Sequence, residues 1–187
     1  MRKVLISAFL LMVFGMLAGQ HGSPLLTHFM ESREAENQSW AICQDEDHLM
    51  LFANRKGISA FDGIEWKHIS LSTIPYAMLK DPFNGRIYIG GDGEFGYIKK
   101  DETGTYSYVS ISEDTTRFGI ITRIIFTESH IWFYSDQCAI RWHKGSAKQD
   151  LKLEPQQGEP FTGIFVKGDK TFVNVYGKGL HRLESDT

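Results

Sequence analysis

A repeated pattern of short apolar runs constrains the fold of this chain more than any other feature. From Ser39 onward, runs rich in Ile, Val, Phe, Tyr and Trp alternate with turns built from Asp, Asn and Gly. Such runs are typical of β-strands, and these turn residues favour the tight hairpins that join strands. No segment after residue 19 keeps the apolar period of a helix. The sequence therefore predicts an all-β fold.

The predicted strands form four groups, at residues 39–72, 76–112, 121–154 and 161–187. Each second strand carries an aromatic residue, at intervals of about 40 residues. Four antiparallel strands at this interval indicate a β-propeller blade, so we expect about four blades of a partial propeller; the alternative is a β-sandwich with coincidental spacing. The aromatic residues are Phe52, Tyr88, Phe133 and Phe172. The expected strands are 39–45, 49–54, 57–63, 65–71, 76–82, 86–91, 94–100, 106–112, 121–127, 130–136, 138–144, 150–154, 161–167, 170–176 and 179–185.

Residues 91–96, GDGEFG, match the G-x-G-x-x-G fingerprint of dinucleotide-binding proteins. A nucleotide loop must lead into a helix whose N-terminus binds the pyrophosphate, whereas Phe95 and the residues after it predict a strand. We therefore interpret Gly91 and Gly93 as a hairpin turn that requires positive φ. Gly96 is interpreted as a site where a neighbouring backbone or aromatic ring approaches closely.

The N-terminus differs from the rest of the chain. Two basic residues precede an uncharged, mostly apolar stretch at residues 4–18, which predicts a secretory signal peptide over residues 1–19. A buried N-terminal helix and a short membrane anchor are the alternatives. Residues 20–38 then form a lead-in segment. A net charge of −3 without clustered Lys and Arg argues against direct nucleic-acid binding.

The two cysteines, Cys43 and Cys138, could form a disulfide in an exported protein. They fall in different predicted blades, so we expect two buried free thiols. The histidines show no metal-ligand spacing, and the sequence predicts neither a metal site nor a cofactor.

Two stretches resemble a known family. Residues 37–45 (NQSWAICQD), 52–54 and 57–66 (GISAFDGIEW) resemble the first blade of periplasmic sensor propellers from two-component-type regulators, which are common in Bacteroidetes. Residues 85–98 (GRIYIGGDGEFGYI) look like the second-blade motif of that family. The resemblance is close over residues 37–100 and holds only at blade level beyond them. The Tyr that the family often has in the lead-in is missing.

The resemblance implies a propeller of about seven blades, followed by a triple-tyrosine immunoglobulin-like domain and a membrane helix. A LuxR-type or histidine-kinase output then follows, and the propeller senses carbohydrate fragments or other extracytoplasmic ligands. This chain ends within a fourth blade, so we expect a truncated, periplasmic front portion of a receptor that is marginally stable or self-associates. Its partners would be the rest of the receptor, including a second copy in a homodimer. Residues 24–29 are a candidate closing strand.

Seven loop residues are candidate ligand-binding residues because propeller ligands usually bind at the channel mouth, between strands two and three and between blades. The alternative for the acidic pair at 92 and 94 is a solvated turn, and for the arginines it is structural ion pairing. Trp40, Trp66, Trp132 and Trp142 could stack on sugar rings, although three of them sit mid-strand, which favours the inter-blade core. The seven candidates are Asn54, Arg55, Asp92, Glu94, Arg117, Arg123 and Asp136.

These observations favour a non-catalytic ligand-sensing module for a small polar or carbohydrate ligand. A protein-interaction scaffold is one alternative, because a propeller face supports many functions. A secreted propeller polysaccharide lyase or hydrolase is another, but no catalytic or metal-binding cluster is visible in the sequence.

Overall fold

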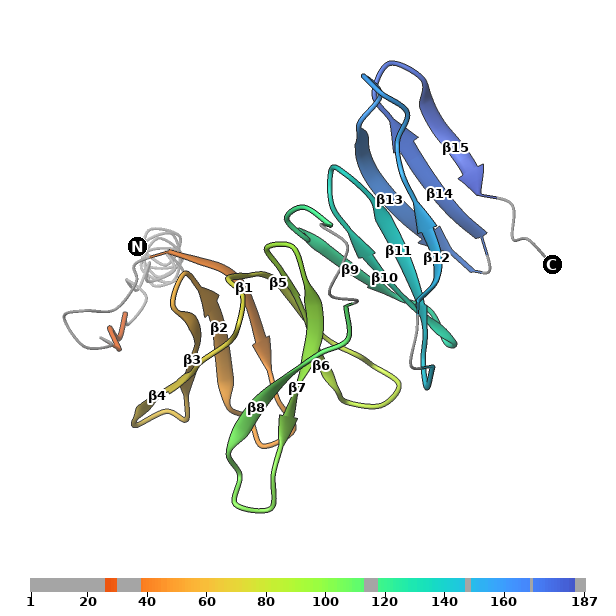
Figure 1. The fold of residues 1–187 in the computed structure, drawn as a ribbon. Helices are drawn as coiled ribbons and strands as arrows, with labels where there is room; N and C mark the ends of the chain where they lie inside the picture. The colour runs from red at the N-terminus through yellow and green to blue at the C-terminus, as the bar shows by residue number, and fades with distance from the viewer. Residues whose placement is uncertain (1–25, 30–37, 113–117, 147–148, 169, 184–187) are drawn as a thin grey trace, which may run out of the picture. The chain divides into compact units, whose positions relative to one another are not determined.

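The computed structural model of the chain divides into two units, residues 1–33 and 34–187. In the first unit only residues 26–29 are described, and they form no strand or helix. The predicted signal peptide therefore lies outside the described residues, as does most of the lead-in. Within the described part of the chain, no helix is long and apolar enough to cross a membrane. The described residues are 26–29, 38–112, 118–146, 149–168 and 170–183 (Figure 1).

The second unit contains four antiparallel sheets, each built from strands that follow one another in the sequence (Figure 1). We call them blades 1 to 4. Blade 1 contains β1 (Ser39–Gln44), β2 (Met50–Asn54), β3 (Gly57–Phe61) and β4 (Trp66–Ile69). Blade 2 contains β5 (Pro75–Lys80), β6 (Ile87–Gly91), β7 (Phe95–Lys100) and β8 (Tyr106–Ser110). Blade 3 contains β9 (Arg123–Phe126), β10 (His130–Tyr134), β11 (Ala139–His143) and β12 (Gln149–Leu153). Blade 4 contains β13 (Phe161–Lys167), β14 (Lys170–Val175) and β15 (Gly179–Leu183).

The predicted all-β fold of propeller blades is confirmed. Every described strand overlaps the range expected for it, and the ends differ by one or two residues at most. This agreement has a physical basis. Each face of a propeller blade packs against a neighbouring blade, so its strands need apolar residues, and the hairpins that join the strands need Asp, Asn or Gly.

The equivalence of the second-strand aromatic residues is wrong. Tyr88 and Phe133 face one another across the interface of blades 2 and 3, with ring centroids 6.3 Å apart. Equivalent residues of successive blades would point in the same direction instead. Ile89 pairs with Met78 of the first strand in blade 2. Phe133 pairs with Ile124 at the same position in blade 3, so Ile89 is the true counterpart of Phe133. Because side chains alternate along a strand, an offset of one residue reverses the face.

Three hydrophobic clusters lie between successive sheets and join the blades. Leu51, Ile58 and Ile89 belong to the cluster of blades 1 and 2, and all three are fully buried. Blades 2 and 3 meet at Tyr88, Phe95 and Phe133, and blades 3 and 4 meet at Trp132, Ile164 and Val173. Burial of a large apolar side chain stabilises a fold by about 1.5–3 kcal/mol, so these clusters fix how each blade lies against the next.

The glycines of the 91–96 stretch have different roles. Gly93 has a φ of 76°, as expected for the turn. Gly91 does not have positive φ, which corrects our interpretation: it lies in β6, and a Cβ there would be 2.3 Å from Thr73 Cγ2. Its small size therefore serves close packing. A Cβ on Gly96 would be 2.2 Å from the Val109 carbonyl oxygen, which confirms the predicted close approach.

Both cysteines are free thiols, as predicted. Cys138 is buried, but Cys43 is only half-buried, and burial together with Asp45 raises the pKa of its thiol to about 11. Trp132 and Trp142 lie in the inter-blade core, as their mid-strand positions indicated. The other two tryptophans are partly exposed and pack on aromatic neighbours, one of them with its ring centroid 4.7 Å from that of Tyr76.

Candidate functional site

A polar groove of about 670 Å³ lies where turns of blades 2 and 3 meet the first strand of blade 4. We call it the mouth groove. It combines the turn between the second and third strands of two blades with the connection that enters blade 3 and the first residues of β13. This is the kind of position where the sequence predicted a ligand site. Its lining residues are Asp92, Gly119, Ile120, Thr122, Arg123, Tyr134, Asp136, Gln137, Phe161 and Thr162.

Backbone hydrogen bonds fix the blade 2 side of the mouth groove. The connection from blade 2 to blade 3 pairs with the β6–β7 turn through a bridge between Asp92 and Ile120. The Gly93 amide donates to the Gly119 carbonyl at 2.9 Å, and the Ile121 amide donates to the Gly91 carbonyl at 2.9 Å. Ile121 is fully buried, so it anchors this connection in the core. The groove wall is therefore part of the folded blade.

The β10–β11 turn forms the blade 3 side, and the buried Ser135 organises it. The Ser135 hydroxyl accepts hydrogen bonds from the amides of Gln137 at 3.1 Å and Cys138 at 3.0 Å. It donates to the Phe118 carbonyl at 2.5 Å. Such a serine turn holds the two residues at its tip, Asp136 and Gln137, and both are exposed. Ser135 was not among the seven candidates, although a serine before a polar turn is a recognisable turn signal.

Arg123 supplies the positive charge of the mouth groove. It is the first residue of β9, it is exposed, and its guanidinium lies 6.0 Å from the Phe165 ring centroid. Within the described part of the chain, this guanidinium makes no hydrogen bond or ion pair. By contrast, the guanidinium of Arg141 in the same blade donates to Asp150 at 3.0 Å. An unpaired guanidinium beside polar groups can bind a carboxylate or sulfate through two parallel hydrogen bonds.

Three of the seven predicted residues come together in the mouth groove: Asp92, Arg123 and Asp136. Glu94 is adjacent in sequence but does not line the groove, and its carboxylate accepts a hydrogen bond from the Ser72 hydroxyl at 2.5 Å. Arg117 lies outside the described residues.

The other two predicted residues lie in the β2–β3 turn of blade 1 and do not line the mouth groove. Asn54 is buried; its side chain donates to the Ser59 hydroxyl at 2.8 Å and accepts from the Lys56 amide at 3.0 Å. Its polar atoms therefore stabilise the hairpin itself. Arg55, at the tip of that turn, is exposed.

Four polar lining residues were not among the seven candidates. Tyr134 ends β10, Thr122 precedes β9 and Thr162 lies at the start of β13. Gln137 lies beside Asp136. Burial raises the pKa of the Tyr134 hydroxyl, although the charge of Arg123 opposes this, so the phenol remains a neutral donor and acceptor. Threonines and tyrosines at strand ends carry no signal in the sequence that separates them from ordinary strand residues.

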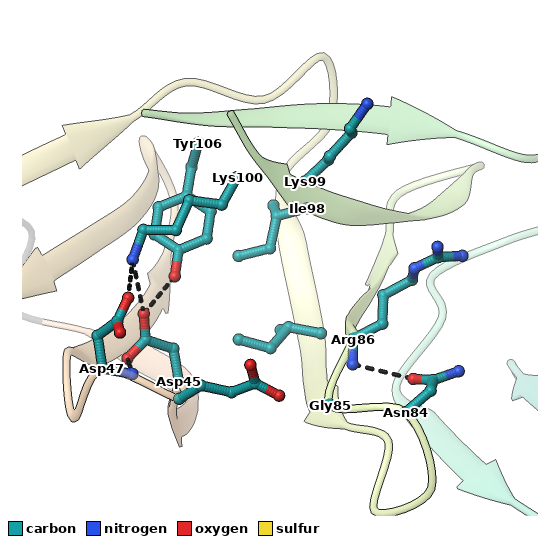
Figure 2. Close-up of a pocket in the computed structure, with 11 residues that line it drawn as sticks. Asp45, Asp47, Asn84, Gly85, Arg86, Ile98, Lys99, Lys100 and Tyr106 are labelled. Atoms are coloured by element: carbon teal, nitrogen blue, oxygen red, sulfur yellow. Dashed lines mark hydrogen bonds and ion pairs between the residues drawn. The ribbon is translucent and has the colours of Figure 1, made fainter. Parts of the chain in front are cut away.

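A second cavity of about 250 Å³ lies between the β1–β2 turn and blade 2. Figure 2 shows Lys100 directed at both Asp45 and Asp47, and the Tyr106 hydroxyl directed at Asp45. Burial favours protonation of Asp45, but hydrogen bonds from Tyr106 and Leu49 and the charge of Lys100 outweigh it, so its pKa lies below the usual value. The charged groups at this end of the cavity are thus paired with one another. Among the described residues, no group of three or more His, Cys, Asp or Glu side chains could hold a metal ion.

Comparisons with known proteins relate the fold to two solved structures. One is the extracellular domain of a putative hybrid two-component system from B. thetaiotaomicron, with a TM-score of 0.56 and 16% identity over 78% of this chain. The other is a catalytically inactive virginiamycin B lyase from Staphylococcus aureus with quinupristin, with a TM-score of 0.53 and 11% identity over 75% of this chain.

This chain spans 20% of the length of the sensor domain and 50% of the length of the lyase. No protein-family model and no curated protein matches the chain. The structural likeness shows the fold, and it confirms at that level the resemblance to sensor propellers seen in residues 37–100.

Proposed function

We propose that this chain is a ligand-sensing propeller module of an extracytoplasmic receptor, and that its mouth groove binds a polar ligand bearing an anionic group. The observation that carries the proposal is the unpaired guanidinium of Arg123 in a groove that residues of three blades line. The likeness in fold to an extracellular sensor domain supports the receptor context. The rest of such a receptor would supply the output.

The polar groups around Arg123 favour a hydroxyl-rich ligand. Asp92 and Asp136 are acceptors that suit sugar hydroxyls, and the Thr122 hydroxyl can both donate and accept. The Thr162 hydroxyl already donates to the Asn174 carbonyl at 3.3 Å and accepts from the Asn174 side chain at 2.6 Å. Arg123 adds a site for one carboxylate or sulfate group. Together these groups fit a sugar that carries an acidic substituent better than a neutral sugar or an apolar molecule.

We propose that the groove binds its ligand without catalysing a reaction. General acid–base catalysis of glycosidic cleavage needs a pair of groups aimed at the same bond, often with one shifted pKa. Among the described residues that line the groove there is no histidine or cysteine, and its two carboxylates are Asp92 and Asp136. We therefore assign Asp92 and Asp136 a role in recognition.

Isothermal titration of the protein with glucuronic acid, and with glucose as its neutral counterpart, tests this proposal. We expect binding of the acid only, and a loss of about tenfold or more for Arg123→Ala, because a hydrogen bond to a charged group contributes about 1.5–3 kcal/mol. The matched control is Arg182→Ala, since Arg182 is exposed on β15 and does not line the groove. Equal affinity of the acid for the Arg123→Ala protein, or no binding by the unaltered protein, would refute the proposal.

A further inference from the structure

A third cavity lies next to the mouth groove along blade 3. It has a volume of about 450 Å³ and lies between the β10–β11 turn and the connection from β12 to β13. We call it the side groove. Gln156 and Gln157 of that connection line it, as do Lys152 and Glu154.

The two grooves share the turn at Asp136 and Gln137, both of which line each cavity. Gln137 lies at this junction in close contact with Gly119 on the blade 2 side. A Cβ on Gly119 would be 2.9 Å from Gln137 Cδ, and the φ of 69° at this position also favours glycine. Because Gly119 has no side chain, the side chain of Gln137 can lie between the two grooves.

The cations of the two grooves differ in their pairing. Arg123 gives the mouth groove an unpaired cation, whereas the ammonium of Lys152 in the side groove pairs with Glu154 at 2.6 Å. Besides the Asp136 carboxylate, which both grooves share, the side groove offers the neutral amides of Gln156 and Gln157, which can donate and accept hydrogen bonds. Such amides suit neutral hydroxyl groups.

We propose that the mouth groove and the side groove are two compartments of one site for a linear acidic oligosaccharide. The charged sugar unit binds at Arg123, the chain crosses the turn at Gln137, and neutral units occupy the side groove. This inference rests on the proposed function and adds to it a minimum ligand length and a direction of binding.

Aldouronic acids test the inference, because they join one glucuronic acid to a neutral xylose chain of increasing length. We expect the affinity measured by titration to rise about tenfold or more from glucuronic acid to aldotetraouronic acid, and xylotetraose without the acid to bind far more weakly. Gln157→Ala should reduce the gain in affinity that a longer oligosaccharide brings. Gln44→Ala is the matched control, since Gln44 lies in β1 outside both grooves.

The outcomes separate the two proposals. Binding of glucuronic acid that does not strengthen with chain length overturns the two-compartment site and leaves the proposed function standing. A gain with length that Gln157→Ala does not reduce, while Arg123→Ala weakens every acid, also overturns the side groove as the second compartment. If no aldouronic acid and no glucuronic acid binds, both proposals fail.

Discussion

The first two blade interfaces contain an ion pair that has no counterpart at the third interface within the described part of the chain. Asp45 pairs with Lys100 between blades 1 and 2, and Asp81 pairs with Lys144 at 2.9 Å between blades 2 and 3. Each aspartate directly follows the first strand of its blade. Each lysine lies at the end of the third strand of the next blade.

Thr127 takes the equivalent position in blade 3. The aspartates both stabilise a local turn and pair with a lysine, and the threonine separates these two roles. One oxygen of Asp45 accepts from the Leu49 amide at 2.8 Å, and one oxygen of Asp81 accepts from the Phe83 amide at 3.0 Å, so both stabilise a local turn. The Thr127 hydroxyl does the same for the His130 amide at 2.9 Å. A threonine keeps the turn but has neither a second oxygen nor a charge for a lysine of the next blade.

The mouth groove of the candidate site crosses the interface between blades 3 and 4. Phe161 and Thr162 of blade 4 form one of its walls. Blade 4 is joined to blade 3 through the apolar cluster that includes Trp132 and Ile164. A ligand that contacts both blades would add contacts at the interface where this ion pair is absent from the described residues, and binding would stabilise the folded state.

Removal of Asp81 should produce the largest effect. Its side chain is fully buried and that of Lys144 is 14% exposed, so Asp81→Ala leaves a largely buried ammonium without its partner and removes a turn acceptor. We expect a loss of about 3–5 kcal/mol in the free energy of unfolding, measured by equilibrium urea denaturation. Glu102→Ala, at the exposed tip of the β7–β8 hairpin, is the control and should change it by less than about 0.5 kcal/mol. A loss below about 1 kcal/mol for Asp81→Ala would mean that the ion pair does not distinguish the interfaces.

Asp45→Asn should have a smaller effect that depends on pH. Lys100 is one-third exposed, so solvent screens the pair, and we expect a loss of about 1–2 kcal/mol at neutral pH. The pKa of Asp45 in the folded state is below the unfolded value of about 3.9. Its charge therefore contributes stability above pH about 4, and this is lost as pH falls through the folded pKa. Urea denaturation of both proteins from pH 7 to pH 3 should show their difference shrinking below pH about 4; a difference that grows there would contradict this sign.

The sequence predicted the strands well because each strand and hairpin is specified by residues adjacent in the chain. It predicted the site only in part. Asp92, Arg123 and Asp136 could be assigned to the mouth from their loops, but which loops converge depends on how the blades pack. Asn54 shows why the site prediction was incomplete, because a polar residue at a strand end can form its hydrogen bonds within its own hairpin.

The inter-blade ion pairs were missed for the same reason. Asp45 and Lys100 come from different blades, and alignment of the repeats by their aromatic residues placed Tyr88 one position out of register. The observed strand pairing shows that the two aspartates occupy equivalent positions.

Thr127→Val should have the smallest effect of the three. Valine keeps the shape of threonine and removes the hydroxyl, which accepts from the His130 amide at 2.9 Å and donates to the His130 carbonyl at 3.2 Å, so we expect a loss of about 1 kcal/mol by urea denaturation. Thr171→Val is the control, because the Thr171 hydroxyl makes no hydrogen bond within the described residues. If Thr127→Val costs as much as Asp81→Ala, the shared turn contact accounts for both losses, and the charge adds nothing. A clearly smaller loss of stability for Thr127→Val would assign the additional loss for Asp81→Ala to the ion pair with Lys144. Blades 2 and 3 share this contact, and Thr127 cannot make it.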